Sequence, residues 1–84
     1  MSKFSTVDLA HDIIEMWNRG EAVILEDSEG MPIFNLSALE MSPNYLVSEE
    51  GYRKTNYYLI RDNKPEQTPA FTLHYLPNDL HPFL

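Results

Sequence analysis

Apolar residues near the start of the chain recur at positions i, i+4, i+7 and i+8, which is the spacing of one buried face of a helix. The residues of this stripe are Leu9, Ile13, Met16 and Trp17. Another face of the same segment is acidic and carries Asp8, Asp12 and Glu15. The segment therefore predicts an amphipathic helix that packs its apolar stripe on the core.

Both ends of this helix carry boundary signals. Ser5 can cap the N-terminus, with Asp8 three positions later as the reciprocal acid of a capping box. Phe4 and Leu9 occupy the positions of a hydrophobic staple. Gly20 favours termination, because glycine adopts the left-handed conformation that ends many helices. The helix is therefore expected to begin after Ser5 and to end before Gly20.

Runs of β-favouring residues separated by short turns fill most of the remaining chain. They predict strands at residues 22–25, 45–48, 54–61 and 70–76. No crossover helix separates the later strands, so the sheet should be antiparallel. The sequence predicts one α+β domain over residues 1–84, with an antiparallel β-sheet of about five strands, an N-terminal helix and a short second helix.

Residues 31–41 allow two interpretations. Ile33, Phe34 and Leu36 could form the return strand of a hairpin. Ser37 and Glu40 instead have the spacing of a capping box, which favours a short helix. The pattern leaves hairpin and helix open.

Charge is unevenly distributed along the chain. The 84 residues include 13 acidic and 6 basic ones, with a formal net charge of -7, and residues 1–50 hold ten of the acids against two basic residues. Such a surface repels phosphate backbones and attracts basic proteins, although acidity can also serve solubility alone. Direct nucleic-acid binding is therefore not expected, and the five tyrosines are expected in the core or an interface.

No residue arrangement in the sequence supports catalysis. His11, His74 and His81 lack metalloprotease spacing, and the chain has no cysteine to complete a metal site. It also lacks a Gly-x-Ser-x-Gly nucleophile motif, and its glycines lie too far apart to cradle a phosphate. We therefore expect no enzyme, no catalytic residue, no metal and no cofactor.

No apolar run reaches the roughly 18 residues that a membrane span requires, and the N-terminal residues lack the apolar core of a signal peptide. The expectation is a cytoplasmic protein that does not bind membranes.

Three motifs together resemble the phage-type uracil-DNA glycosylase inhibitors. Asp-Ile-Ile-Glu at residues 12–15 is followed, at the family's interval, by Val-Ile-Leu-Glu at 23–26. Pro32 and Pro43 bracket a short apolar helix, and Pro-Glu-x-x-Pro at 65–69 precedes the apolar last strand. The chain departs from the family at Asp27, where the family has serine, and in an apolar rather than acidic bracketed helix.

The resemblance implies a DNA mimic that binds the glycosylase one to one, is monomeric when free, and is encoded by a phage or mobile element in a bacterial host. In this family the glutamate that corresponds to Glu26 is a principal contact to the enzyme. The implied partner-binding residues are Glu26, Asp27, Ser28, Glu29, Glu49 and Glu50, and the carboxylates among them stand in for phosphates.

The resemblance also implies a hydrophobic pocket between the short helix and the sheet, which takes up the apolar side chain that the enzyme inserts into DNA. Its expected lining is Phe34, Leu39, Met41, Tyr58, Ile60 and Leu73. The same side chains could equally form an ordinary core.

Two alternatives remain open at this level. The first is an acidic inhibitor of another nucleic-acid enzyme, such as a restriction or CRISPR nuclease, because a negative surface would attract that enzyme's basic cleft equally well. A small antitoxin or immunity protein is suggested by the capped helix, the apolar strand and the Gly-Met-Pro-Ile stretch at 30–33. A DNA-binding antitoxin should carry basic residues in its first helix. The acidic residues of this helix argue against that interpretation.

Overall fold

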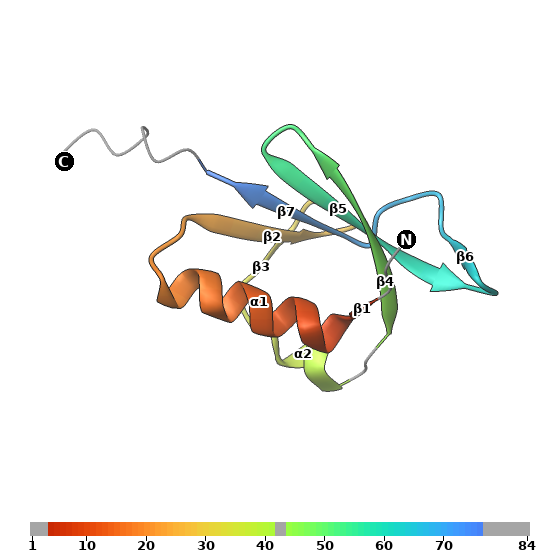
Figure 1. Cartoon of the computed structure of the whole chain (residues 1–84), viewed down its shortest axis with the longest axis horizontal. Helices are drawn as coiled ribbons and strands as arrows, with labels where there is room; N and C mark the ends of the chain where they lie inside the picture. Colours follow the sequence, from red (N-terminus) through yellow and green to blue (C-terminus); the bar gives the residue numbers. More distant parts are fainter. Residues whose placement is uncertain (1–3, 42–43, 77–84) are drawn as a thin grey trace.

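The computed structural model describes residues 4–41 and 44–76, which form two helices and seven strands (Figure 1). In chain order these are β1 (Phe4–Ser5), α1 (Thr6–Asn18), β2 (Val23–Asp27), β3 (Pro32–Ile33), α2 (Ser37–Met41), β4 (Tyr45–Gly51), β5 (Lys54–Arg61), β6 (Lys64–Pro65) and β7 (Phe71–Tyr75). Neither described helix has the length and apolar character needed to cross a membrane.

The strands form one curled antiparallel sheet in the order β1-β4-β5-β7-β2-β3, and β6 pairs with β5 outside this path. The predicted α+β class is confirmed. The seven strands exceed the predicted number of about five, because β1, β3 and β6 are two-residue pairings that flank the four longer strands.

Both helices pack on one face of the sheet, where the core lies. Leu9 and Ile13 of α1 are buried there against Leu25, Leu46 and Leu73 of the sheet. Direct pairing places Leu25 opposite Leu73, so both side chains project to the helix side. Side chains of the alternate positions project to the other face, which we call the open face; no described helix covers it.

The capping signals of α1 are confirmed. The Asp8 backbone N–H donates to the Ser5 hydroxyl at 3.2 Å, and the Ser5 backbone N–H donates to the Asp8 carboxylate at 3.1 Å. After the helix ends at Asn18, Gly20 has a φ of 80°, the left-handed region that glycine adopts without strain.

Replacing Ser5 with alanine should therefore lower the free energy of unfolding by about 0.5–2 kcal/mol, because one N-terminal amide loses its acceptor. Urea unfolding followed by circular dichroism measures the change. Ser5→Asn is the matched control, since asparagine also caps well and should restore most of the stability.

In residues 31–41 both elements form, one after the other. Pro32 and Ile33 pair with β2, and the short helix α2 follows at Ser37–Met41. The cap differs from the prediction, because the Asn35 side-chain oxygen accepts from the Ser37 backbone N–H at 3.0 Å and from its hydroxyl at 2.6 Å. Pro43 lies outside the described residues.

Candidate functional site

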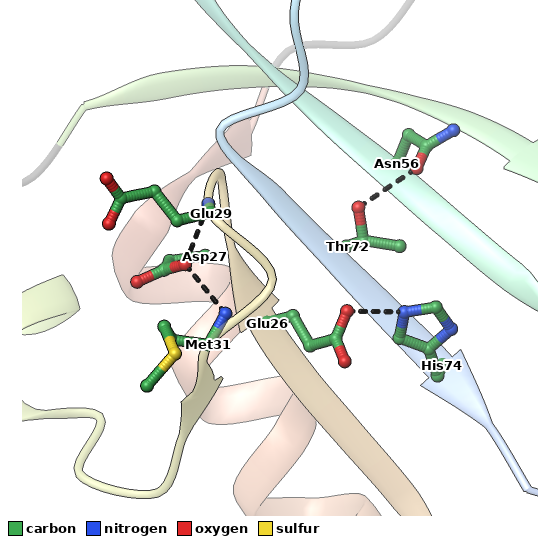
Figure 2. Close-up of polar contacts among 7 residues, drawn as sticks. All are labelled: Glu26, Asp27, Glu29, Met31, Asn56, Thr72 and His74. Carbon is green, nitrogen blue, oxygen red and sulfur yellow. Dashed lines mark hydrogen bonds and ion pairs between the residues drawn. The ribbon is translucent and has the colours of Figure 1, made fainter.

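The acidic loop after β2 is organised by Asp27. One oxygen of its carboxylate accepts from the backbone N–H of Glu29 at 2.9 Å and of Met31 at 3.0 Å (Figure 2). The backbone closes the same turn through bonds from Asp27 to Met31 and from Gly30 to Asp27, and Gly30 has a φ of 80°. Asp27 therefore shapes the loop, while Ser28 and Glu29 are exposed at its tip.

Glu26 lies on the open face of the sheet, where its carboxylate oxygen Oε1 contacts Nε2 of His74 at 2.9 Å (Figure 2). His74 is the diagonal neighbour of Glu26, whose direct partner on β7 is Thr72. Both side chains are half-buried, with exposed fractions of 31% for Glu26 and 36% for His74. The second oxygen, Oε2, has no hydrogen-bond partner within 4–41 and 44–76, so it is free to bind a partner.

No role for His74 was predicted from the sequence, and the structure gives it a contact with Glu26. Alternation within β7 did indicate that Thr72 and His74 face away from the apolar Phe71 and Leu73. The contact with Glu26 could not be foreseen, because it depends on the pairing of β2 with β7.

A polar row crosses the open face through four strands. Direct pairing aligns Glu26 of β2 with Thr72 of β7, Thr72 with Asn56 of β5, and Asn56 with Glu49 of β4. The Thr72 hydroxyl donates to the Asn56 side-chain oxygen at 3.1 Å (Figure 2). A carboxylate therefore stands at each end of a row whose middle is uncharged. The basic Lys54 lies opposite His74 in the adjacent row.

At the β4 end of the row, the Tyr58 hydroxyl donates to the Glu49 carboxylate at 2.9 Å. This hydrogen bond raises the pKa of Tyr58, and the negative charge of Glu49 adds to the rise. The bond also orients the carboxylate on the open face.

The structure divides the six predicted partner-binding residues. Glu26 and Glu49 share the open face, and Ser28 and Glu29 lie in the loop beside β2. Asp27 pairs with Phe71, and Glu50 pairs with Thr55, so both project to the helix side. Successive side chains of a strand point to opposite faces of the sheet, so two consecutive acids cannot share a face.

The six residues predicted to line one pocket are not brought together. Leu73 and Leu39 are buried on the helix side of the sheet. Tyr58 and Ile60 occupy the alternate positions of β5 whose side chains project to the open face. A sheet separates the two pairs, so a single pocket cannot contain both.

The other two members of that set are surface residues. Phe34 is 75% exposed and Met41 is 80% exposed. Phe34 follows the short strand β3, where no further sheet pairing covers it, and Met41 ends α2.

A cavity does occur between α2 and the sheet, with a largely different lining. It has a volume of about 220 Å³ and is lined by Thr6, Ile33, Asn35, Ala38, Leu39, Asn44, Leu59 and Phe71. Only Leu39 belongs to the predicted set. A dry cavity of about 150 Å³ is large enough to hold benzene, so this one has room for an aliphatic side chain.

The tyrosines divide between core and surface. Tyr57 is buried on the helix side, with its ring edge-on to Phe4 at 5.6 Å between centroids. Burial raises the pKa of the Tyr57 hydroxyl, and the neighbouring Tyr75 adds to the rise. Tyr45 and Tyr52 are exposed.

The described part of the chain brings no three metal-ligating side chains together. Comparison with family models, with curated proteins and with solved structures finds no match to this chain.

Proposed function

We propose that this protein inhibits a uracil-DNA glycosylase by occupying its DNA-binding cleft as a DNA mimic. The observation that carries the proposal is the polar row of the open face, which holds the carboxylates of Glu26 and Glu49 at its two ends. The target is chosen on the sequence resemblance, in which Glu26 corresponds to the principal contact.

The spacing of these carboxylates is compatible with the geometry of DNA. Neighbouring strands lie roughly 4.8 Å apart, so three strand steps separate the Cα atoms of Glu26 and Glu49 by roughly 14 Å. The major groove of B-DNA is about 12 Å wide, which is the same order of distance between flanking phosphates. Basic side chains that grip both sides of a groove could therefore meet both carboxylates.

The exposed acids near the row extend the negative field. Glu29 lies at the tip of the acidic loop, and the formal net charge of the chain is -7. A complementary field speeds the encounter with a basic cleft, and salt screens it. We expect association to be slowed by added salt more strongly than dissociation is changed.

The cavity beside α2 supplies a place for the side chain that a base-flipping enzyme inserts into the stack. Ile33, Leu59 and Phe71 contribute apolar walls. Burial of an aliphatic side chain there would slow dissociation, because desolvated apolar contacts dominate off-rates.

The proposal is tested by mixing the purified chain with a uracil-DNA glycosylase and a uracil-containing oligonucleotide. Equimolar protein should abolish base excision, and sedimentation should show a 1:1 complex. Undiminished excision would refute the glycosylase as target. Inhibition of a restriction or CRISPR nuclease in a parallel assay would then assign the open face to that class of enzyme.

Glu26→Gln should weaken the complex about ten-fold, because a hydrogen bond to a charged group contributes about 1.5 kcal/mol or more. The measurement is the inhibition constant in the excision assay. Asp12→Asn is the matched control, since it removes the same charge from an exposed position of α1, on the helix side. Equal inhibition by the Glu26 variant and the control would remove Glu26 from the interface.

A further inference from the structure

The outer edge of β4 is unpaired over much of its length. β4 pairs with β5 from Leu46 to Gly51, but with β1 only at Tyr45 and Leu46. The Thr6 backbone N–H donates to the Asn44 carbonyl at 2.9 Å, which identifies the β4 positions whose backbone groups point away from β5.

By alternation, the outward N–H and C=O groups beyond the β1 pairing are those of Ser48 and Glu50. No described residue pairs with β4 at these positions on its outer side. Val47–Gly51 therefore forms an open strand edge.

The protection of this edge against strand addition comes from its two glutamates, whose charge repels acidic strands but not basic ones. The stretch Val47–Gly51 contains no proline and no lysine. Its register with β5 runs without a bulge from the Leu46 and Leu59 pair to the Gly51 and Lys54 pair. An edge of this kind can accept one more strand from another chain, provided that the added strand is not acidic.

A groove beside this edge indicates the chemistry of the added strand. It lies on the open face, has a volume of about 440 Å³, and is lined by Val47, Ser48, Glu49, Tyr58, Pro65 and Glu66. Two of these side chains are carboxylates, one is an aromatic ring, and none is basic. The Glu66 carboxylate pairs with Nε of Arg61 at 3.1 Å, so Glu49 is the acid that can receive a further cation. An arginine or lysine side chain can lay its apolar stem on Tyr58 and Pro65, above the buried Val47, and hold its charge near Glu49.

We propose that the β4 edge binds an extended basic segment of a partner protein, which adds as a strand along Val47–Gly51 and places an arginine or lysine in this groove. Pairing with a second copy of the chain is opposed by charge, since it would bring Glu49 and Glu50 of both copies together. The groove shares Glu49 with the polar row, but it is separate from the cavity beside α2, and the proposal does not depend on the target named above.

The test uses three nine-residue peptides titrated into the intact protein by calorimetry, with backbone amide shifts recorded by NMR. The first alternates arginine with threonine, the second replaces each arginine with glutamate, and the third is the first with every backbone amide N-methylated. The arginine peptide should bind and shift the amides of Ser48 and Glu50 most. The glutamate and N-methylated peptides should bind at least ten-fold more weakly.

Ser48→Pro removes one outward N–H without breaking the β5 ladder, because proline is tolerated where its missing N–H would face solvent. It should weaken binding of the arginine peptide at least ten-fold, whereas the control Ser48→Ala should not. Glu49→Gln should weaken binding about two- to five-fold, as expected for an exposed ion pair. Its control, Glu50→Gln, removes the same charge from the next position of β4, which projects to the other face and lies outside the groove.

Equal binding of the arginine and N-methylated peptides would overturn strand addition, and so would wild-type binding by folded Ser48→Pro protein. Equal binding of the glutamate peptide, or no binding of the arginine peptide, would overturn the basic partner. Concentration-dependent dimers in sedimentation would assign the edge to a second copy instead. If Ser48→Pro does not fold, the N-methylated peptide decides the same question. None of these assays contains the glycosylase, so their outcome is independent of the inhibition assay.

Discussion

Replacing Leu73 with alanine is expected to lower the free energy of unfolding by about 2–5 kcal/mol, the largest effect that the structure predicts. Leu73 is fully buried, and it pairs directly with Leu25 on β2 and with Thr55 on β5. Truncation removes apolar contacts at the centre of the sheet and leaves a cavity beneath α1. A domain of this kind has only about 5–15 kcal/mol in total, so the variant should unfold at markedly lower urea.

Phe34→Ala is the matched control, because the sequence analysis assigned both residues to one pocket. Phe34 is 75% exposed, so its truncation should change the free energy of unfolding by no more than about 0.5 kcal/mol. Urea titration with tryptophan fluorescence, which Trp17 provides, measures both variants. Similar losses for Leu73→Ala and Phe34→Ala would contradict the separation of core and surface described here.

Thr6→Val is expected to cost about 1–3 kcal/mol, which is the penalty for leaving buried polar groups without their partner. The Thr6 hydroxyl is buried, donates to the Leu39 carbonyl at 2.9 Å and accepts from the Asn44 backbone N–H at 3.1 Å. It thereby ties the start of α1 to α2 and to the segment that leads into β4. Valine keeps the shape of the side chain, so the loss reports the hydrogen bonds and not the packing.

Thr6→Ser supplies the complementary control, because it keeps the hydroxyl and removes one methyl group. Its expected cost is about 0.8 kcal/mol, the value for one buried carbon. Thermal and urea unfolding should rank the proteins as wild type, serine variant and valine variant in falling stability. The reverse order of the two variants would show that the methyl contact, not the hydroxyl, secures this junction.

Most elements of the fold could be predicted from the sequence, because the relevant signals are local. The capping box at Ser5 and Asp8 involves residues three positions apart. The β5 strand was predicted at its observed bounds, 54–61, and the turn after it follows from Asp62 and Asn63. These two residues have φ values of 54° and 63°, which Asp and Asn tolerate well.

The two-residue strands β1 and β6 escaped prediction, and β3 was only one of two open interpretations, since such strands are too short to show a period. Their existence depends on a long neighbour that offers backbone groups. Pro32 and Ile33 form a strand only because β2 lies beside them, after which the chain still has the helical signal of residues 37–41.

The candidate site was predicted less well than the fold. The acidic loop at Asp27 to Glu29 was found correctly as a cluster, but Asp27 serves the turn with its carboxylate. The residues predicted to line the pocket project to both faces of the sheet, because the sequence alone does not show which face of β5 lies toward α2. The observed cavity uses Leu59, the neighbour of both predicted β5 residues, Tyr58 and Ile60.

By itself, the sequence determined the negative charge, the N-terminal helix, the long strands and the turns between them. These properties follow from residue type and from spacings of a few positions. Only the tertiary structure decided that Glu26 contacts His74 and that Glu26 and Glu49 lie at the two ends of one polar row. It also decided that the outer edge of β4 is left unpaired beyond Leu46. Each of these depends on strand order and register, which are set by the packing of side chains far apart in the chain.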